Sequence, residues 1–405
     1  MIDLSKRGLR VLAWPGPSQS QSNPYTSLVY GEFEQAGLAI TPYSIWKFHG
    51  SRAEIFHIHW PEAILWGRLA RHVPLTTELA ARRVLNTMDI IRRNGGAVVW
   101  TAHNVSPHAL STQHHQRVWG RFFPEFRRKV DALIGLTSRS LDLICDAYAD
   151  LRQCSRFVVP HPHYRTVYPA PPSPREARAA IGLAQGRFVL AMIGTIRRGK
   201  GVTEAARIFR KVRKENEVLF ISGHCSDAEL AADIQSAAGK DPSVIFQNRY
   251  LPDAELVRSF AAADAVLINQ SATLNSGTLL LALSMNRPTI APAKGSIVEL
   301  AESVGAGWIS TFSGEIGPDA LRNALDTIQD HDRGGQAPLD RFDPEAVSRA
   351  TMAVLAQVLA ARRSTNSAVT PSAAPETAAS IGGARITAAS IRSHHNAHAR
   401  KWGRQ

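Results

Sequence analysis

Residues 188–202 read FVLAMIGTIRRGKGV, and this stretch decides the fold class. The run 188–193 is short and apolar, as expected for a strand that is buried on both faces of a sheet. A glycine-rich turn runs from Gly194 to Gly201, and a helical pattern follows it. A buried strand that passes through such a turn into a helix is the repeating unit of a parallel sheet covered by helices.

The same alternation of apolar runs and helical stretches extends in both directions. Towards the N-terminus it predicts strands at 9–14, 55–60, 97–102 and 132–136, and helices at about 24–35, within 63–93 and after the possible N-cap Ser138. Towards the C-terminus it predicts strands at 188–193, 218–222, 244–246, 265–269 and 289–291. Between the two series, residues 159–174 contain six prolines and no helical pattern, which predicts a linker.

These patterns predict an α/β protein with two Rossmann-like, doubly wound domains that face each other across a cleft. The domains are expected at 1–165 and 166–363, and the Ala/Ser/Thr-rich segment 364–405 is expected to form a disordered basic tail. Because open parallel sheets bind ligands at the carboxyl ends of their strands, the functional site is expected in the cleft.

The composition of the 405-residue chain is that of a soluble globular protein, with 44% hydrophobic and 20% charged residues. It contains no run of about 18 apolar residues, as a membrane-spanning helix would need. The charged start MIDLSKRGLRVLAW is unlike a secretory signal, and three cysteines form neither a disulfide framework nor a metal-ligand spacing. We therefore expect a cytoplasmic protein.

The net charge of +13 is concentrated in the N-terminal half, where residues 1–165 hold 20 Lys and Arg against 12 Asp and Glu. Such a balance fits an anionic partner, either a membrane surface or a phosphate-bearing substrate, but also an ordinary charged face. The segment 63–93 mixes apolar residues with six arginines, so it could rest on anionic headgroups or simply be solvated. No nucleic-acid recognition pattern is present, and we expect no such partner.

Two glycine-containing segments are candidate anion sites. In the first, Gly194 opens a turn that carries Arg197, Arg198 and Lys200 ahead of a helix, an arrangement that suits a diphosphate. The spacing approaches that of a P-loop, but Gly201 stands where that motif needs a hydroxyl, and a purely structural turn is also possible. In the second, Asn275, Ser276, Gly277 and Thr278 precede an apolar helix, as an anion cradle or an ordinary N-cap would.

Polar side chains also follow two strands of the N-terminal half. His57 and His59 alternate along one strand and should face the same side, with Trp60 and Glu62 at its end. His103 and Asn104 end the next strand in the same way. If the strands are neighbours, the two clusters meet at one rim, although a single strand histidine is more often a packed core residue.

No metal site is expected, because the one Asp-x-Asp pair, Asp330 and Asp332, is far from these motifs in the sequence. Arginine and lysine would then neutralise a diphosphate without a divalent ion.

Taken together, six segments resemble glycosyltransferases of the GT-B fold, and more closely the bacterial β-mannosyltransferases of xanthan-type exopolysaccharide synthesis. The segments are NPY at 23–25 with Tyr30, HIHWPE at 57–62, TAHN at 101–104, PHPHY at 160–164, GTIRRGKGV at 194–202 and NSGTLLLALSMNRPTIAP at 275–292. The resemblance implies transfer of mannose from GDP-mannose to a polyprenyl-diphosphate-linked oligosaccharide, at the inner face of the plasma membrane. A UDP-sugar-dependent glucosyl- or glucuronosyltransferase, or a GT-B protein that binds without catalysing, remains an alternative.

The resemblance also assigns roles to residues. Glu62 is the first choice of catalytic base, with His59 and His103 as rivals. The expected donor-binding residues are Gly194, Arg197, Lys200, Asn275, Ser276, Gly277 and Thr278. The expected acceptor-binding residues are Asn23, Tyr25, Trp60 and Asn104.

Two departures from larger relatives bear on the mechanism. Retaining GT-B enzymes carry two glutamates eight residues apart, and Thr273 and Leu281 occupy those positions here, which favours an inverting reaction. The pair Arg198-Gly199 replaces a bulkier pair before the lysine and leaves the phosphate geometry open.

Overall fold

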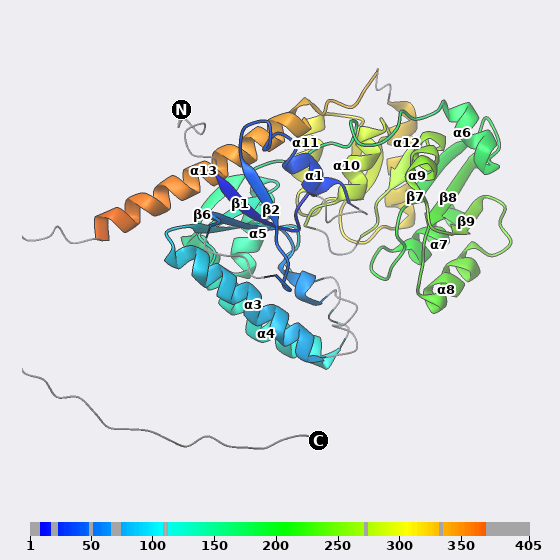
Figure 1. The fold of residues 1–405 in the computed structure, drawn as a ribbon. Helices are drawn as coiled ribbons and strands as arrows, with labels where there is room; N and C mark the ends of the chain where they lie inside the picture. The colour runs from blue at the N-terminus through cyan, green and yellow to red at the C-terminus, as the bar shows by residue number, and fades with distance from the viewer. Residues whose placement is uncertain are drawn as a thin grey trace, which may run out of the picture.

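The computed structural model describes residues 9–17, 23–47, 52–65, 74–107, 110, 112–270, 274–331 and 335–369. Within this part of the chain lie two α/β units, each built on a six-stranded sheet whose neighbouring strands are all parallel. Figure 1 shows the two units side by side, with helices on both faces of each sheet. This arrangement confirms the predicted α/β class and its two doubly wound sheets.

The first sheet has the strand order β2-β1-β3-β4-β5-β6. Its strands are β1 (Arg10–Trp14), β2 (Ala39–Pro42), β3 (Ile55–Ile58), β4 (Ala97–Thr101), β5 (Ala132–Gly135) and β6 (Ser155–Val158). The helical segments between them are α1 (Tyr25–Val29), η2 (Pro61–Leu65), α3 (Pro74–Arg93), α4 (Gln113–Arg128), α5 (Ser138–Ala147) and η3 (Ala149–Gln153).

The second sheet has the order β12-β11-β10-β7-β8-β9. Its strands are β7 (Phe188–Ile193), β8 (Glu217–Gly223), β9 (Val244–Asn248), β10 (Ala265–Leu267), β11 (Thr289–Pro292) and β12 (Ile309–Phe312). The helices of this unit are α6 (Pro174–Ile181), α7 (Val202–Val212), α8 (Ala228–Ala238), α9 (Asp253–Ala262), α10 (Gly277–Ser284), α11 (Ile297–Val304) and α12 (Pro318–Asp330), followed by η4 (Asp340–Phe342) and α13 (Pro344–Val369).

Strand alternation divides each sheet between two cores. In β1, Leu12 and Trp14 pack with α3 and α4, whereas Val11 and Ala13 pack with α1 and α13. The second sheet is covered in the same way, by α7, α8 and α12 on one face and by α9, α10 and α11 on the other. Both faces of the central strands are therefore buried, which accounts for their continuous apolar runs.

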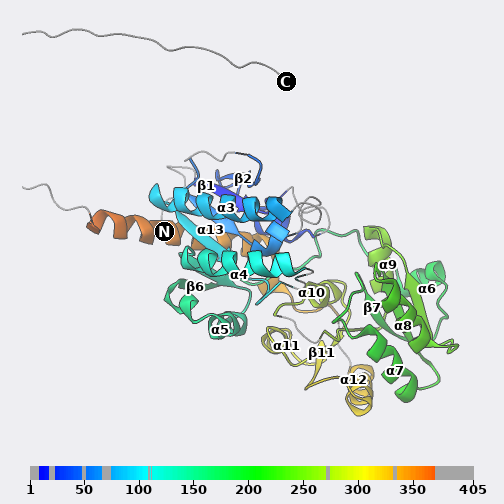
Figure 2. The same cartoon turned by 90° about the horizontal axis from the view of Figure 1, so that it is seen from below.

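Helix α13 returns from the second unit to the first, as Figures 1 and 2 show. Its side chains Val347 and Leu355 are buried in the same cluster as Val11 and Ala13 of β1. The predicted range 166–363 for the second domain therefore contains a helix that packs on the first. Residues 364–369, predicted to begin the tail, continue α13, and residues 370–405 lie outside the described part of the chain.

Several local predictions need correction. The sequence patterns missed β2, β6 and β12, all of which lie at sheet edges and are only partly buried. The helix expected at 24–35 is the single short helix α1 followed by turns. The N-cap of α5 is Thr137, whose hydroxyl accepts a hydrogen bond from the Ser140 amide, and Ser138 is the first helical residue.

Among the described residues, no helix combines the length and the apolar character needed to cross a membrane.

Candidate active site

The rim of the first sheet brings together side chains from β3, β4 and the segment after α1. His57 and His59 both share hydrogen bonds with the Tyr30 hydroxyl, at 2.9 Å from Nδ1 of His57 and 2.8 Å from Nε2 of His59. The two histidines thus face the same side, as the strand period predicted. Because β3 pairs with β4, the second polar cluster also reaches this rim.

These contacts form one continuous hydrogen-bonded chain. His57 Nε2 lies 2.8 Å from Thr101 Oγ1, and His59 Nδ1 lies 3.3 Å from His103 Nε2. Burial lowers the pKa of His57 to about 3 and, with neighbouring imidazoles, holds the pKa values of His59 and His103 well below the usual range. All three imidazoles are therefore neutral at pH 7, and each ring carries a single N–H.

Glu62 lies on η2, the helical segment that follows β3, and is 5% exposed. Its Oε1 accepts a hydrogen bond of 2.9 Å from the side-chain amide of Asn104. Burial raises the pKa of Glu62, although hydrogen bonds from a backbone N–H and from Asn104 partly offset the effect. The carboxylate is thus a stronger base than an exposed glutamate.

Aromatic rings pack around the histidines of this rim. Tyr25 packs edge-on against His59, Trp60, His103 and His161, with ring centroids 4.7–5.9 Å apart. Trp60 stacks on His103 at 4.4 Å. Tyr25, predicted to bind the acceptor, is 2% exposed and so offers almost no surface of its own in this arrangement.

In the second unit, the glycine-rich turn joins β7 to α7. Gly201 is the N-cap of α7 and has a φ of 62°, in the left-handed region that glycine tolerates best. A Cβ at this position would lie 2.4 Å from Nδ2 of Asn269, and that amide donates a hydrogen bond to the Gly201 carbonyl. The local backbone therefore requires glycine where a P-loop would carry a hydroxyl.

The second glycine-containing segment begins α10. The Ser276 hydroxyl accepts a hydrogen bond from the Leu279 amide and caps the helix. Its neighbour Asn275 donates from Nδ2 to the backbone carbonyl of His103, at 3.4 Å. This contact links the start of α10 directly to the histidine cluster of the other unit.

Both glycine-containing segments open into one cavity of about 350 Å³ between the two units. Its lining includes all seven predicted donor-binding residues: Gly194, Arg197, Lys200, Asn275, Ser276, Gly277 and Thr278. Asn23, predicted to bind the acceptor, lines the same cavity from the first unit. Of the described residues that line it, two are cations and none is a carboxylate, so the cavity suits an anion.

Lys200 and Arg198 differ in their surroundings. Burial, with a smaller effect of the Arg197 charge, lowers the pKa of Lys200 to about 8. Arg198 instead forms ion pairs with Asp227 and Glu229 at the surface and does not line the cavity. Of the three cations in the GTIRRGKG segment, Arg197 and Lys200 therefore line the cavity and Arg198 does not.

The structure also places residues that the sequence analysis did not assign to the site. His161 and Tyr164 come from the linker, where Tyr164 lines the cavity and its hydroxyl lies 3.3 Å from His161 Nε2. Tyr168, Leu256, Phe260, Gln270 and Leu281 complete much of the lining. The PHPHY segment at 160–164 was the part of the sequence that could have identified His161 and Tyr164 as site residues.

Of the two positions where retaining GT-B enzymes carry glutamates, Thr273 lies outside the described residues. Leu281 places an apolar side chain in the cavity.

Comparison with known proteins finds relatives by sequence and by fold. No family model matches the chain. A GDP-mannose:glycolipid 4-beta-D-mannosyltransferase from Xanthomonas campestris pv. campestris is 28% identical over 330 residues, which cover 80% of this chain and 85% of the relative.

Among solved structures, sucrose-phosphate synthase from Thermosynechococcus elongatus superposes with a TM-score of 0.62 at 13% identity, over 87% of this chain and 100% of that one. The catalytic domain of starch synthase IV from Arabidopsis thaliana, bound to ADP and acarbose, gives a TM-score of 0.58 at 11% identity, over 88% and 100%. The chain thus has the GT-B fold of these structures, and its sequence is similar to that of the mannosyltransferase from Xanthomonas campestris.

Proposed function

We propose that this chain is an inverting β-mannosyltransferase that moves mannose from GDP-mannose to a lipid-linked oligosaccharide in exopolysaccharide synthesis. The observation that carries the proposal is the cavity in which Arg197, Lys200 and the start of α10 meet, beside the histidine rim. The relative from Xanthomonas supports the choice of GDP-mannose and of a glycolipid acceptor.

In the proposed reaction, the acceptor hydroxyl oxygen attacks the anomeric carbon of mannose from the face opposite the diphosphate. The new C–O bond forms as the bond to the GDP oxygen breaks, so the configuration inverts. The hydroxyl proton passes to a base, and GDP leaves with the negative charge. Leu281 supports inversion, because it places no carboxylate where retaining relatives hold a sugar hydroxyl.

We assign the base to Glu62 in preference to His59 and His103. Burial weakens both histidines as bases because it lowers their pKa values, whereas burial raises the pKa of Glu62. Burial therefore strengthens the carboxylate as an acceptor of the hydroxyl proton and weakens the two imidazoles in the same role. Asn104 keeps the carboxylate oriented, and Trp60 offers the sugar an aromatic edge beside it.

Departure of GDP needs positive charge at the diphosphate. Arg197 and Lys200 supply it, and Ser276, Gly277 and Thr278 bring the first amides of α10 to the same cavity. Since these groups can neutralise the diphosphate, we propose that the transfer needs no divalent ion.

We also propose that the enzyme works on the cytoplasmic face of an anionic membrane, held there by its first unit. Leu75 and Leu79 at the start of α3 are 74% and 42% exposed, and Arg82 follows on the next turn. Exposed leucines next to arginine suit a bilayer interface. Trp66, Arg68 and Arg71 of the predicted amphipathic segment lie outside the described residues.

The proposal is tested by titrating the purified protein with GDP and UDP, each with and without EDTA, and then by following transfer from GDP-mannose. Tighter binding of GDP that EDTA does not change, followed by mannose transfer to a lipid-linked oligosaccharide, is the expected result. Preference for UDP would exclude the mannosyl donor, and nucleotide binding without transfer to any acceptor would favour a non-catalytic protein. Sedimentation with anionic but not neutral vesicles tests the membrane contact.

A further inference from the structure

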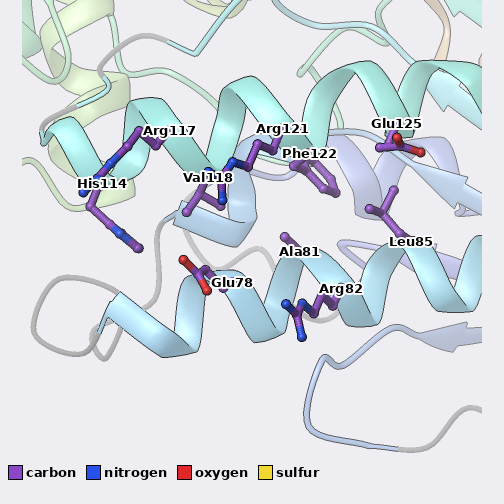
Figure 3. A pocket seen from close by; sticks show the side chains of 10 residues that line it. All are labelled: Glu78, Ala81, Arg82, Leu85, His114, Arg117, Val118, Arg121, Phe122 and Glu125. Atoms are coloured by element: carbon purple, nitrogen blue, oxygen red, sulfur yellow. The ribbon is translucent and has the colours of Figure 1, made fainter.

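A second cavity lies away from the diphosphate site, between α3 and α4, with a volume of about 340 Å³ (Figure 3). We refer to it as the α3–α4 groove. Its floor is apolar and is formed by Ala81 and Leu85 of α3 and by Val118 and Phe122 of α4. Since Ala81, Val118 and Phe122 are themselves core residues, the floor is a fixed part of the fold.

Three arginines border this floor. Arg82 comes from α3, and Arg117 and Arg121 come from successive turns of α4, as Figure 3 shows. All three are exposed, and within the described part of the chain none of them forms a hydrogen bond or an ion pair through its side chain.

Other arginines of the same two helices are paired. Arg92 pairs with Asp131, Arg127 with Asp150 and Arg128 with Glu125. The pairing of Arg128 also offsets the charge of Glu125, one of two glutamates that line the groove; the other is Glu78. The groove therefore keeps an excess of unpaired positive charge around an apolar floor, a combination that fits an amphiphile with an anionic head.

The position of the groove relates it to the proposed reaction. Its floor belongs to the same core cluster as Ile64 and Leu65 of η2. Glu62, the proposed base, lies on that same element. A molecule in the groove thus rests against the elements that hold the catalytic rim.

We propose that the α3–α4 groove binds the lipid part of the acceptor, with its phosphate groups on Arg82, Arg117 and Arg121 and the adjoining isoprenoid units over the apolar floor. This inference rests on the proposed function and names where that enzyme would hold its lipid. Guanidinium groups bind phosphate oxygens in pairs of hydrogen bonds, which suits a diphosphate. A cavity of this size accepts the head of a polyprenyl diphosphate and leaves the rest of the chain to the membrane.

The first test measures binding without catalysis. A short-chain prenyl diphosphate, kept below its micelle concentration and without vesicles, is titrated into the wild-type protein and into the Arg117→Ala, Arg121→Ala and double variants. We expect the double variant to weaken binding by about tenfold or more, given the usual strength of contacts between arginine and phosphate. Arg175→Ala, which removes an exposed arginine from α6 of the second unit, is the matched control and should leave the affinity unchanged.

The second test measures transfer to two acceptors that carry the same oligosaccharide, one as a prenyl diphosphate and one as a methyl glycoside. The arginine variants should raise KM for the first acceptor and leave KM for the second and kcat for both near the wild-type values. Equal losses with both acceptors would overturn the proposal, as would inorganic diphosphate binding as tightly as the prenyl form. An effect seen only with anionic vesicles would make the groove a general membrane contact. Binding of the prenyl diphosphate without any transfer would contradict the proposed function while supporting the lipid site.

Discussion

The side chain of Glu62 is the residue on which the proposed chemistry depends most. Replacing it with glutamine keeps the shape and the contact with Asn104 but removes the proton acceptor. Because general-base assistance contributes about 10²–10⁴ in rate, turnover of Glu62→Gln should fall by that order while GDP affinity stays the same. Glu34→Gln, an exposed change in the same unit, is the control. Wild-type turnover in Glu62→Gln would exclude this glutamate as the base.

Lys200 predicts a pH dependence of nucleotide binding. Its pKa is lowered to about 8 by burial and by Arg197, so it is charged below pH 8 and loses its proton above that value. At pH 9 about one molecule in ten retains the proton, and GDP affinity should therefore be about tenfold weaker than at pH 7. Lys200→Arg keeps its charge throughout and should abolish most of this change. Titration calorimetry at pH 7 and pH 9 measures the GDP affinity of the wild-type protein and of Lys200→Arg. If the affinity changed with pH equally in the two proteins, Lys200 would not be the origin of the pH dependence.

At the scale of single residues, the sequence predicted some side-chain contacts of the candidate site and missed others. The alternation in HIHWPE was enough to place His57 and His59 on one face, because strand geometry is local. Tyr30, which joins them, lies on another segment 27 and 29 residues away in the chain, and no local pattern predicts that contact. Arg198 was grouped with Arg197 and Lys200, but its carboxylate partners come from the segment that begins α8.

Secondary structure elements were predicted according to how deeply they are buried. The central strands β1, β3, β4, β7 and β8 are covered on both faces and read as continuous apolar runs. Among the edge strands, β9 begins with the apolar run 244–246 and was predicted although it is partly exposed. The edge strands β2, β6 and β12 are partly exposed and contain polar residues, so hydrophobic periodicity did not reveal them. Element order therefore followed from the sequence, whereas the width of each sheet did not.

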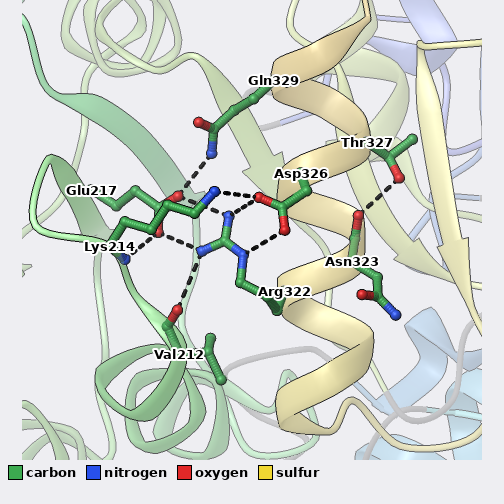
Figure 4. A network of polar contacts seen from close by, with 8 residues as sticks. All are labelled: Val212, Lys214, Glu217, Arg322, Asn323, Asp326, Thr327 and Gln329. Carbon is green, nitrogen blue, oxygen red and sulfur yellow. Dashed lines mark hydrogen bonds and ion pairs between the residues drawn. The ribbon is translucent and has the colours of Figure 1, made fainter.

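An ion pair between a buried carboxylate and a partly exposed arginine attaches α12 to the second sheet, as Figure 4 shows. Glu217, at the start of β8, is fully buried, and its two oxygens accept hydrogen bonds from Arg322 at 2.8 and 2.9 Å. Burial alone would raise the pKa of Glu217, but hydrogen bonds from Arg322, the Lys214 amide and Gln329 outweigh it and lower that pKa. The carboxylate is thus charged and depends on these donors.

Removing Arg322 should destabilise the folded protein, because the buried carboxylate of Glu217 would lose its cationic partner. We expect Arg322→Ala to lower the free energy of unfolding by about 3–5 kcal/mol, measured by chemical denaturation. Arg349→Ala is the matched control, since its pairs with Glu345 and Glu32 are at the surface, where such pairs contribute about 1 kcal/mol or less. Equal losses in the two variants would contradict this account of the network.

At the scale of the whole molecule, contacts between the units come from segments far apart in the chain. Glu299 of α11 accepts hydrogen bonds from the Ser138 and Arg139 amides, at 3.3 and 3.0 Å, and so satisfies the N-terminus of α5 in the other unit. Asn275 reaches the His103 carbonyl in the same way. The orientation of the two units is thus tied to the residues that surround the candidate site, and no local sequence pattern encodes it.

The path of α13 leads to a prediction about how each unit unfolds. Leu355 is fully buried with residues of the first sheet, although it follows the second unit in sequence, whereas Leu325 of α12 is fully buried in the second unit. Replacing either leucine with alanine should cost about 2–5 kcal/mol. Because a ligand stabilises the unit that binds it, GDP should raise the transition of the second unit selectively in calorimetry.

The two variants should then affect different transitions. Leu325→Ala should lower the GDP-sensitive transition, and Leu355→Ala should lower the other one while leaving GDP affinity at 20 °C near the wild-type value. This result is expected if α13 completes the core of the first unit, so that the first unit becomes stable only after the chain has passed through the second and returned. If Leu355→Ala instead lowered the GDP-sensitive transition, α13 would belong energetically to the second unit, and the division of the chain into folding units would follow its sequence order.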